Sequence, residues 1–323
     1  MQSIANADAT AILPYVITTK VEVALGVVEL TLRHELGYRL PEWTPGSHID
    51  LILPNGLTRQ YSLCGDRWDA YSYRVAVLRE NNGRGGSAMI HDQLSIGDHV
   101  GIGGPRNNFP MVPSENYAFI GGGIGITPLL PMINQARGLG ANWRLLYGGR
   151  TKEAMAYLNE IAEFGGDVII VPEDREGLLP LSDWISELSK DVSKLYVCGP
   201  SRLLDVVEAL CADWPVGGLR TERFVPKLLS APVRSAPFDV ELARSGRTVT
   251  VPPDSSILDV VREVGVNVLS SCREGTCGTC QVTVLSGQPE HRDSVFDDDE
   301  RERNDAMFVC VSRSCSDKLV LDL

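Results

Sequence analysis

The sequence lacks any apolar run long enough to cross a membrane, although 43% of its 323 residues are hydrophobic. Its N-terminus lacks the basic segment and the apolar segment that together mark a secretory signal peptide. Positive charge is also scarce, since the net charge at pH 7 is −12. That balance disfavours nucleic acids and anionic membranes as partners. We therefore expect a cytoplasmic protein that binds neither nucleic acid nor membrane.

The sequence also lacks any histidine arrangement typical of a metal site or a catalytic triad. We expect its five histidines to be structural or exposed: His34, His48, His91, His99 and His291. Eight cysteines in a chain of this size fit thiol or metal chemistry better than a disulfide framework. No internal repeat is present, and the length predicts two or three domains.

A cysteine pattern near the C-terminus is the most informative motif. Cys272, Cys277 and Cys280 have the spacing C-x4-C-x2-C, and Cys310 follows after 29 intervening residues. This spacing is typical of the plant-type [2Fe–2S] cluster, with three thiolates on one loop and the fourth from a distant segment. Zinc and disulfides are the alternatives. Zinc prefers two paired knuckles, and Cys310 has no partner two residues away.

Negative charge is concentrated at the same end of the chain. Residues 237–323 contain 16 acidic and 9 basic residues, and an unbroken acidic run from Asp297 to Glu300 precedes Cys310. A solvated loop is one interpretation of this run. The other is a surface that docks a basic partner.

Residues 1–111 contain short apolar or alternating runs separated by Gly, Pro and Asn. The expected strands lie at 16–23, 27–32, 48–53 and 73–78. Several short strands at this spacing predict an antiparallel barrel.

Residues 112–226 alternate between buried strands and helical stretches. A strand from Tyr117 leads through a Gly-rich turn to Pro128 near the start of a helix. Further strands are expected at 143–147, 167–171 and 194–198, and helices at 153–164 and 201–212. This alternation predicts a doubly wound α/β sheet.

Residues 227–236 lack periodicity and predict a linker. In the last segment, 237–323, strands at 238–242 and 248–251 form an expected hairpin around Ser245 and Gly246. A helix at 256–264 precedes the cysteine loop.

Four further motifs fit cofactors with phosphate groups. Arg59-Gln-Tyr-Ser places Arg59 and Tyr61 on one face of a strand, and Gly-Arg-Gly-Gly-Ser follows at 83–87, where a helix can open toward a phosphate. Alone, the first motif also fits an ordinary strand. Gly-Gly-Gly-Ile-Gly-Ile-Thr-Pro at 121–128 and Cys-Gly-Pro at 198–200 both fall at strand C-termini, where open α/β sheets bind ligands.

These five motifs, in this order, resemble the phthalate dioxygenase reductase and vanillate O-demethylase reductase family of the ferredoxin–NADP reductase superfamily. The resemblance covers nearly the whole chain. It implies an antiparallel β-barrel that binds a flavin, a doubly wound α/β domain that binds a pyridine nucleotide, and a C-terminal β-grasp domain of the plant-type ferredoxin class.

The resemblance also assigns roles to residues. Tyr61 should pack on the isoalloxazine ring and Ser62 should contact its N5 edge. Arg59, Gly85, Gly86 and Ser87 should hold the phosphate. The nucleotide should lie on Gly122, Gly123, Gly125, Thr127, Cys198, Gly199 and Pro200, with Cys198 near the nicotinamide.

Phe224 matches the aromatic residue that ends the nucleotide domain near the flavin. Ser62, Cys198 and Phe224 are therefore expected beside the reacting rings. Arg223 and Val225 depart from the familiar pattern around that aromatic, so core packing is the alternative role for Phe224.

The resemblance favours FMN over FAD and NADH over NADPH. Arg150 and Lys152 supply two cations after the second strand of the α/β sheet, which leaves NADPH open.

The combination of cofactors dictates an order of transfer. A hydride carries two electrons and a [2Fe–2S] cluster accepts one, so a flavin must divide the pair. Electrons therefore pass from NADH to the flavin as a hydride, from the flavin to the cluster one at a time, and from the cluster to an external acceptor. The resemblance implies a reductase whose acceptor is a terminal oxygenase of the Rieske type, and we expect it to be a monomer. A cytochrome P450 or another monooxygenase is an alternative acceptor. A redox sensor is an alternative of a different class, which the flavin and nucleotide motifs disfavour.

Overall fold

The computed structural model describes residues 14–80, 83–191, 193–227 and 231–323. Residues 1–13 of the expected barrel and 228–230 of the expected linker lie outside the described residues. The chain divides into two compact units, Met1–Glu222 and Arg223–Leu323, each with its own hydrophobic core. In the described part of the chain, no helix is long and apolar enough to span a membrane.

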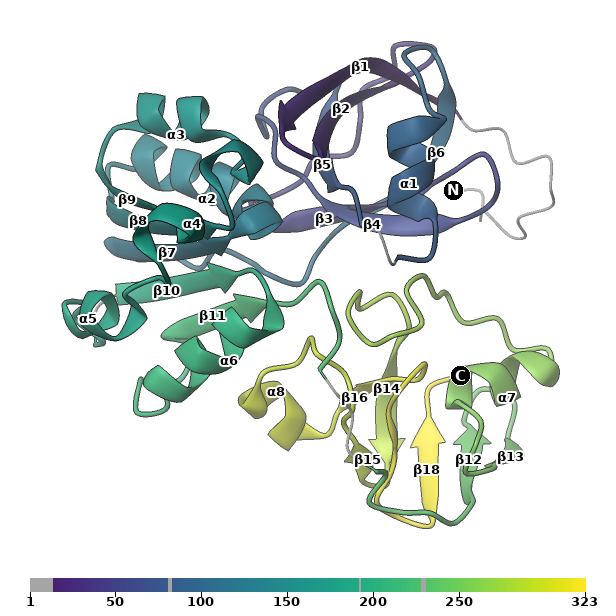
Figure 1. Ribbon diagram of the computed structural model, residues 1–323. Helices are drawn as coiled ribbons and strands as arrows, with labels where there is room; N and C mark the ends of the chain where they lie inside the picture. The colour runs from purple at the N-terminus through teal and green to yellow at the C-terminus, as the bar shows by residue number, and fades with distance from the viewer. Residues whose placement is uncertain (1–13, 81–82, 192, 228–230) are drawn as a thin grey trace. The chain divides into compact units, whose positions relative to one another are not determined.

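Unit 1 begins with a six-stranded antiparallel sheet in the order β4-β3-β6-β1-β2-β5. Its strands are β1 Tyr15–Ala24, β2 Val27–His34, β3 Ser47–Ile52, β4 Thr58–Ser62, β5 Tyr73–Leu78 and β6 His99–Asn107. A bridge between Leu63 and Val75 joins the chain just after β4 to β5, so the two outer strands of the order meet. Figure 1 shows the curved sheet with α1, Gly86–Asp92, beside it. The predicted antiparallel barrel is confirmed.

The barrel core follows from alternation along its strands. On β2, Leu30 and Leu32 are fully buried, whereas Glu29 and Thr31, which alternate with them, point to the other face. The buried core side chains come from five of the six strands, from α1 and from the segments between them, and Tyr61 of β4 packs against them. Glu29 is therefore available on the outer face of the barrel for contacts with the rest of unit 1.

The second part of unit 1 is a five-stranded parallel sheet in the order β11-β10-β7-β8-β9. Its strands are β7 Asn116–Gly122, β8 Asn142–Gly149, β9 Asp167–Pro172, β10 Ser193–Cys198 and β11 Leu219–Glu222. The helices between them are η1 Gly123–Gly125, α2 Ile126–Gly138, η2 Lys152–Ala154, α3 Leu158–Phe164, α4 Glu173–Glu176, α5 Leu181–Ser186 and α6 Ser201–Leu210.

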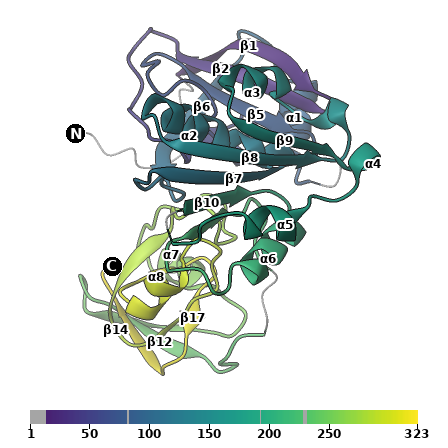
Figure 2. The same cartoon turned by 90° about the vertical axis from the view of Figure 1, so that its left-hand side faces the viewer.

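Helices cover both faces of this parallel sheet. Phe119 of β7 packs in the cluster that contains α2 and α3, and the next residue, Ile120, packs in the cluster that contains α5 and α6. Figure 2 shows the two helix pairs on opposite sides of the sheet. The predicted doubly wound architecture is confirmed, and its strand order reverses between β7 and β10.

The helix expected at 153–164 is shorter and interrupted, so that prediction was wrong in its extent. A 3₁₀ turn, Lys152–Ala154, is capped by Thr151, whose hydroxyl accepts from the Ala154 N–H at 3.3 Å. The chain then extends at Met155 and turns left-handed at Tyr157, with φ 65°, before α3 begins. Tertiary contacts explain the break, because Met155, Ala156 and Tyr157 are all buried.

Unit 2 contains a five-stranded sheet in the order β13-β12-β18-β14-β16 and a two-stranded sheet of β15 and β17. The strands are β12 Phe238–Leu242, β13 Arg247–Val251, β14 Gln281–Ser286, β15 Pro289–Glu290, β16 Ala306–Phe308, β17 Arg313–Ser314 and β18 Lys318–Leu321. The expected hairpin is confirmed as β12 and β13, and β18 pairs in parallel with β12.

Two short helices complete unit 2. The helix expected at 256–264 is α7, Ile257–Glu263, and the Ser256 hydroxyl caps it by accepting from the Asp259 N–H at 3.1 Å. Four core side chains of α7 pack against the sheet. The acidic run forms the start of α8, Asp298–Arg303, and not the loop that one interpretation expected.

Candidate functional site

The two flavin-type motifs of the barrel meet in space. Arg59 lies on β4 and Gly86 opens α1, and a Cβ at Gly86 would lie 2.6 Å from Arg59 Cγ. The Arg59 guanidinium also donates to the Arg84 carbonyl at 2.8 Å. Gly85 has φ 81°, a conformation that favours glycine. A cation and a glycine turn therefore share one site, which is the donor set that a phosphate requires.

The other flavin-type residues lie on the same elements. Tyr61 packs at the edge of the barrel core, and burial raises the pKa of its phenol, which therefore stays neutral. Ser62 ends β4 and is buried. Ser87, one residue into α1, accepts from the Glu80 N–H at 3.1 Å. The contacts of these side chains with a flavin remain predictions.

The two nucleotide-type motifs are in direct contact. Cys198 at the end of β10 pairs with Gly121 at the end of β7. A Cβ at Gly125 would lie 2.2 Å from the Cys198 carbonyl oxygen, and a Cβ at Gly122 would lie 2.7 Å from Pro200 Cδ. Only glycine permits this approach. The contact lies where the strand order reverses, which is the position at which doubly wound sheets bind ligands.

Thr127 lies in the first turn of α2, beside this contact. Its side chain is buried, and its hydroxyl donates to the Ile124 carbonyl at 2.9 Å. Because that hydrogen is already engaged, the Thr127 oxygen keeps only acceptor capacity, and its contact with a nucleotide stays a prediction.

A carboxyl group that the motif analysis did not single out also lies here. Glu222 at the end of β11 pairs with Cys198, and its Oε2 is buried without a hydrogen-bond partner. Burial raises the pKa of Glu222 to about 8. Burial first, and then Glu222, raise the pKa of the Cys198 thiol. Cys198 is thus a neutral thiol, which agrees with a role in shaping the pocket and not with nucleophilic chemistry.

Phe224 lies two residues after Glu222, the last residue of unit 1. It belongs to unit 2, and 42% of its surface is exposed. Exposure argues against core packing for this side chain. Its predicted place beside a flavin stays a prediction.

The cysteine motif of unit 2 brings its four thiols together as two pairs. Cys277 hydrogen bonds to Cys272 and so lowers the pKa of Cys272. Cys280 hydrogen bonds to Cys310 and so raises the pKa of Cys310. No disulfide joins these four residues. Two pairs of thiols match two irons, each of which takes two protein sulfurs in a [2Fe–2S] cluster.

Backbone N–H groups of the loop point at the sulfurs. Cys272 Sγ accepts from the Glu274 N–H at 3.3 Å, and Cys277 Sγ accepts from the Thr279 N–H at 3.5 Å. Gly275 has φ 71°, and a Cβ there would lie 2.6 Å from Val311 Cγ2. Such N–H groups stabilise thiolates. In the part of the chain that the structure describes, no three His, Cys, Asp or Glu side chains gather tightly enough for a single metal ion.

The acidic run before Cys310 has a structural role. The Asp297 carboxylate accepts from the Glu300 N–H at 2.8 Å, and the Glu300 carboxylate accepts from the Asp297 N–H at 2.9 Å. This reciprocal pair is a capping box at the start of α8. Two of the four acids therefore stabilise the helix terminus, whatever else the run does.

Comparison with known proteins agrees with this arrangement. A family model described as a 2Fe-2S iron-sulfur cluster binding domain matches residues 240–315, which include all four cysteines of the motif. The chain is 38% identical to phthalate dioxygenase reductase from Burkholderia cepacia over 312 residues, which cover 95% of this chain and 96% of that protein.

Two solved structures extend the similarity to the fold. A phthalate dioxygenase reductase, described as a modular structure for electron transfer from pyridine nucleotides to [2Fe-2S], is 38% identical with a TM-score of 0.68, over 96% of this chain and 97% of that one. An intact type IV self-sufficient cytochrome P450 monooxygenase is 38% identical with a TM-score of 0.90. That match covers 96% of this chain and spans 40% of the P450 chain.

Proposed function

This chain belongs to the phthalate dioxygenase reductase family of flavin- and [2Fe–2S]-containing oxygenase reductases, which are NAD(P)H-dependent oxidoreductases, and we propose that it is the NADH-dependent reductase of a two-component Rieske-type oxygenase. The observation that carries the proposal is the direct contact between the Gly125 turn and Cys198, beside a barrel whose Arg59 meets Gly86. A hydride donor and a phosphate-bearing acceptor thus have sites in the same unit. Unit 2 contributes the thiols for one-electron transfer.

The residues fit FMN. Arg59 and the turn that ends at Gly86 supply one cationic and glycine-rich site, which suits the single phosphate of FMN. Tyr61 offers an aromatic face, and Ser62 offers a buried hydroxyl for the N5 edge. When bound, the flavin takes up a hydride and releases its electrons singly. Barrel residues bind and orient it.

The surroundings of Arg150 favour NADH. Arg150 follows β8, and its carbonyl accepts from the Asp174 N–H at 3.1 Å. Asp174 belongs to α4, whose first turn also carries Glu173 and Glu176. Another cation at this edge, Arg175, pairs with Glu153 at 3.3 Å. Acidic groups beside Arg150 oppose a 2′-phosphate and suit a free ribose hydroxyl.

The four cysteines of the C-terminal motif are the proposed cluster ligands: Cys272, Cys277, Cys280 and Cys310. Their paired contacts and the N–H groups aimed at the loop sulfurs support the assignment. A cluster held by these four thiolates would supply one-electron transfer to the acceptor.

A second candidate acceptor is a cytochrome P450. The similarity to part of a self-sufficient P450 monooxygenase favours it, because that chain contains a segment with this fold. Rates of electron transfer to a purified Rieske oxygenase and to a P450 would separate the two acceptors. We expect the Rieske protein to be reduced faster.

Cofactor content tests the assignment of the sites. Purified protein should contain one FMN, two irons and two acid-labile sulfides per chain, because one phosphate site and four paired thiols are present. Extracted flavin should be identified by chromatography, and iron, zinc and sulfide by elemental and chemical assay. FAD in the extract would contradict the flavin assignment, and zinc without sulfide would contradict the cluster.

Neutralising the acids of α8 tests how unit 2 recognises its partner. Asp298→Asn with Asp299→Asn removes two charges and keeps the Asp297–Glu300 capping box. We expect slower association with the oxygenase at low salt. The difference should vanish as the Debye length falls from about 10 Å at 0.1 M to about 3 Å at 1 M salt. Stopped-flow electron transfer across a salt series is the measurement.

The matched control is Asp254→Asn with Glu263→Gln, which removes two charges from exposed side chains elsewhere in unit 2. Its association rate should stay closer to that of the wild type. Equal effects of the two variants would show that net charge matters and the α8 surface does not.

A further inference from the structure

The segment that interrupts the expected helix packs on the barrel, with Tyr157 at its centre. Tyr157 is 8% exposed and adopts the left-handed conformation, with φ 65°. No glycine relieves the strain at this position, so contacts of the side chain must hold the backbone there. The contacts are with the barrel.

The Tyr157 hydroxyl joins β2 and the segment after β4 to the proposed nucleotide-binding part of unit 1. It donates to Glu29 Oε2 at 2.8 Å, and Glu29 lies on the outer face of β2. It also lies 3.5 Å from Cys64 Sγ. Cys64 comes two residues after Ser62, the end of the proposed flavin strand. One hydroxyl therefore connects the start of α3 to the segment that directly follows the strand with the flavin motif.

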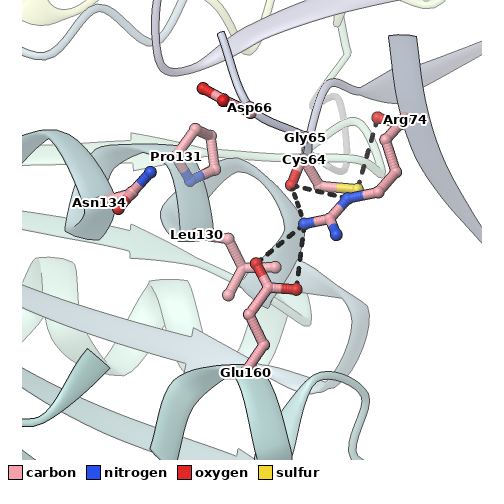
Figure 3. A pocket seen from close by; sticks show the side chains of 8 residues that line it. All are labelled: Cys64, Gly65, Asp66, Arg74, Leu130, Pro131, Asn134 and Glu160. Carbon is pink, nitrogen blue, oxygen red and sulfur yellow. Dashed lines mark hydrogen bonds and ion pairs between the residues drawn. The ribbon is translucent and has the colours of Figure 1, made fainter. Parts of the chain in front are cut away.

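Arg74 on β5 completes this polar cluster. Its guanidinium donates to Glu160 of α3 at 2.9 Å and to the Cys64 carbonyl at 2.6 Å, and it lies 3.5 Å from Glu29. It also covers the Tyr157 ring, 5.4 Å from the centroid. Figure 3 shows Arg74 between Cys64 and Glu160, beside a cavity of about 130 Å³ whose other wall is α2.

Both hydrogen-bonding groups at the centre stay protonated near neutral pH. Burial raises the pKa of Tyr157 far above its usual range, and burial raises the pKa of Cys64 to about 11. The hydroxyl of Tyr157 therefore remains a donor to Glu29 over the range in which the protein works.

The same segment begins at the proposed nucleotide site. Thr151 and Lys152 follow β8, and the Glu153 carbonyl accepts from the Leu25 N–H of the barrel at 2.7 Å. The Tyr147 hydroxyl of β8 donates to the Ala156 carbonyl at 3.2 Å. Residues 151–160 thus begin at the end of β8, beside the proposed nucleotide site, and contact both the barrel and the parallel sheet.

We propose that Tyr157 is a positioning residue for hydride transfer, and that its hydroxyl fixes the α/β sheet against the barrel so that nicotinamide and flavin meet in reactive geometry. The inference rests on the proposed function. Hydride transfer needs the reacting atoms within about 3–3.5 Å, a tolerance that only directional contacts enforce.

Apolar packing alone does not provide that precision. Val27, Ala76 and Phe109 from the barrel side join the core that contains α2, but hydrophobic contact is not directional. The hydrogen bond to Glu29 is directional, and so is the ion pair in which Arg74 Nη2 donates to both carboxylate oxygens of Glu160; together they define an orientation.

The test compares Tyr157→Phe with Tyr73→Phe. The Tyr73 side chain is buried, and its hydroxyl donates to the Pro41 carbonyl within the barrel at 2.5 Å. Each variant loses one buried tyrosine hydroxyl, but only Tyr157→Phe loses a bond between barrel and α3. At saturating NADH, Tyr157→Phe should lower the limiting rate of flavin reduction by about ten- to a hundredfold. Its dissociation constant for NADH should change little.

A readout without turnover accompanies the kinetics. Amide hydrogen exchange in Tyr157→Phe should speed up in 23–29 and in 153–160 together, whereas Tyr73→Phe should leave 153–160 protected. Glu29→Gln keeps an oxygen that can accept from the Tyr157 hydroxyl but removes its negative charge, which weakens the hydrogen bond. It should therefore lower the limiting rate and speed up amide exchange, each less than Tyr157→Phe does. It also tests the proposal if Tyr157→Phe does not fold.

Equal limiting rates in Tyr157→Phe, Glu29→Gln and wild type would overturn the positioning role. That result is distinct from failure of the proposed function, in which NADH would not reduce the flavin of the wild-type protein at all. A loss of NADH affinity with an unchanged limiting rate would also overturn the proposal, because the hydroxyl would then serve binding alone.

Discussion

Cys277→Ser should abolish the [2Fe–2S] cluster and leave reduction of the flavin by NADH within about twofold of the wild-type rate. Cys277 is buried and hydrogen bonds to Cys272, so the variant loses one of the two thiols of a pair. The flavin and nucleotide motifs belong to unit 1, which has its own core. Iron and sulfide assays and stopped-flow bleaching of the flavin are the measurements.

Cys315→Ser is the matched control for this experiment. Cys315 lies in the same unit and is exposed, outside the motif spacing. It should retain full iron content and full electron transfer to the oxygenase. A Cys277→Ser protein that folds but whose flavin NADH cannot reduce would contradict this prediction. It would show that flavin reduction in unit 1 depends on the cluster in unit 2.

Gly125→Ala should lower the rate of flavin reduction by NADH at least about a hundredfold. The added Cβ would lie 2.2 Å from the Cys198 carbonyl oxygen and 2.7 Å from the Gly199 nitrogen. Both atoms belong to the backbone, so β7 and β10 must separate at the proposed nucleotide site. Chemically reduced flavin should still pass electrons to the cluster, since neither site contains Gly125.

Gly138→Ala provides the control. Gly138 ends α2, and a Cβ there would have no neighbour within 4 Å. This variant should reduce its flavin at the wild-type rate. An equally active Gly125→Ala protein would mean that the contact between the two motifs is not part of the nucleotide site.

The architecture was predictable because its signals are local in the sequence. Alternating and apolar runs indicated the strands, and the spacing of Cys272, Cys277 and Cys280 needs no tertiary information. Gly125 and Cys198 were predicted at strand ends. The two residues are in direct contact because β7 and β10 are neighbours in the parallel sheet, and this strand order is known only from the structure.

The residues that sequence reasoning missed depend on contacts between distant segments. The sequence pattern at 153–164 favours one helix, but contacts of the buried Tyr157 with the barrel break it. The local sequence gives no sign that Tyr157 adopts a left-handed conformation. Glu222 directly precedes Arg223 in the sequence, and no motif includes it. Its pKa is raised because the side chain is buried beside β10, which the sequence does not indicate. Only the pairing of β11 with β10 reveals it.

The acidic run shows a different limit. Asp297 followed by Glu300 is a capping-box pattern, which is a local signal for the start of a helix. The charge of the run by itself indicates only a solvated loop or a docking surface. The structure shows that one segment can cap a helix and still present Asp299 to solvent.

Anaerobic addition of NADH to the purified protein tests the central claim most directly. Flavin absorbance should fall first, and the cluster should then become reduced, as seen by its paramagnetic signal. Complete reduction should need about 1.5 NADH per chain, because the flavin holds two electrons and the cluster one. The contradicting result is that NADH bleaches the flavin fully but leaves the cluster oxidised, although dithionite reduces it. Electrons would then not pass singly from the flavin in unit 1 to the cluster in unit 2.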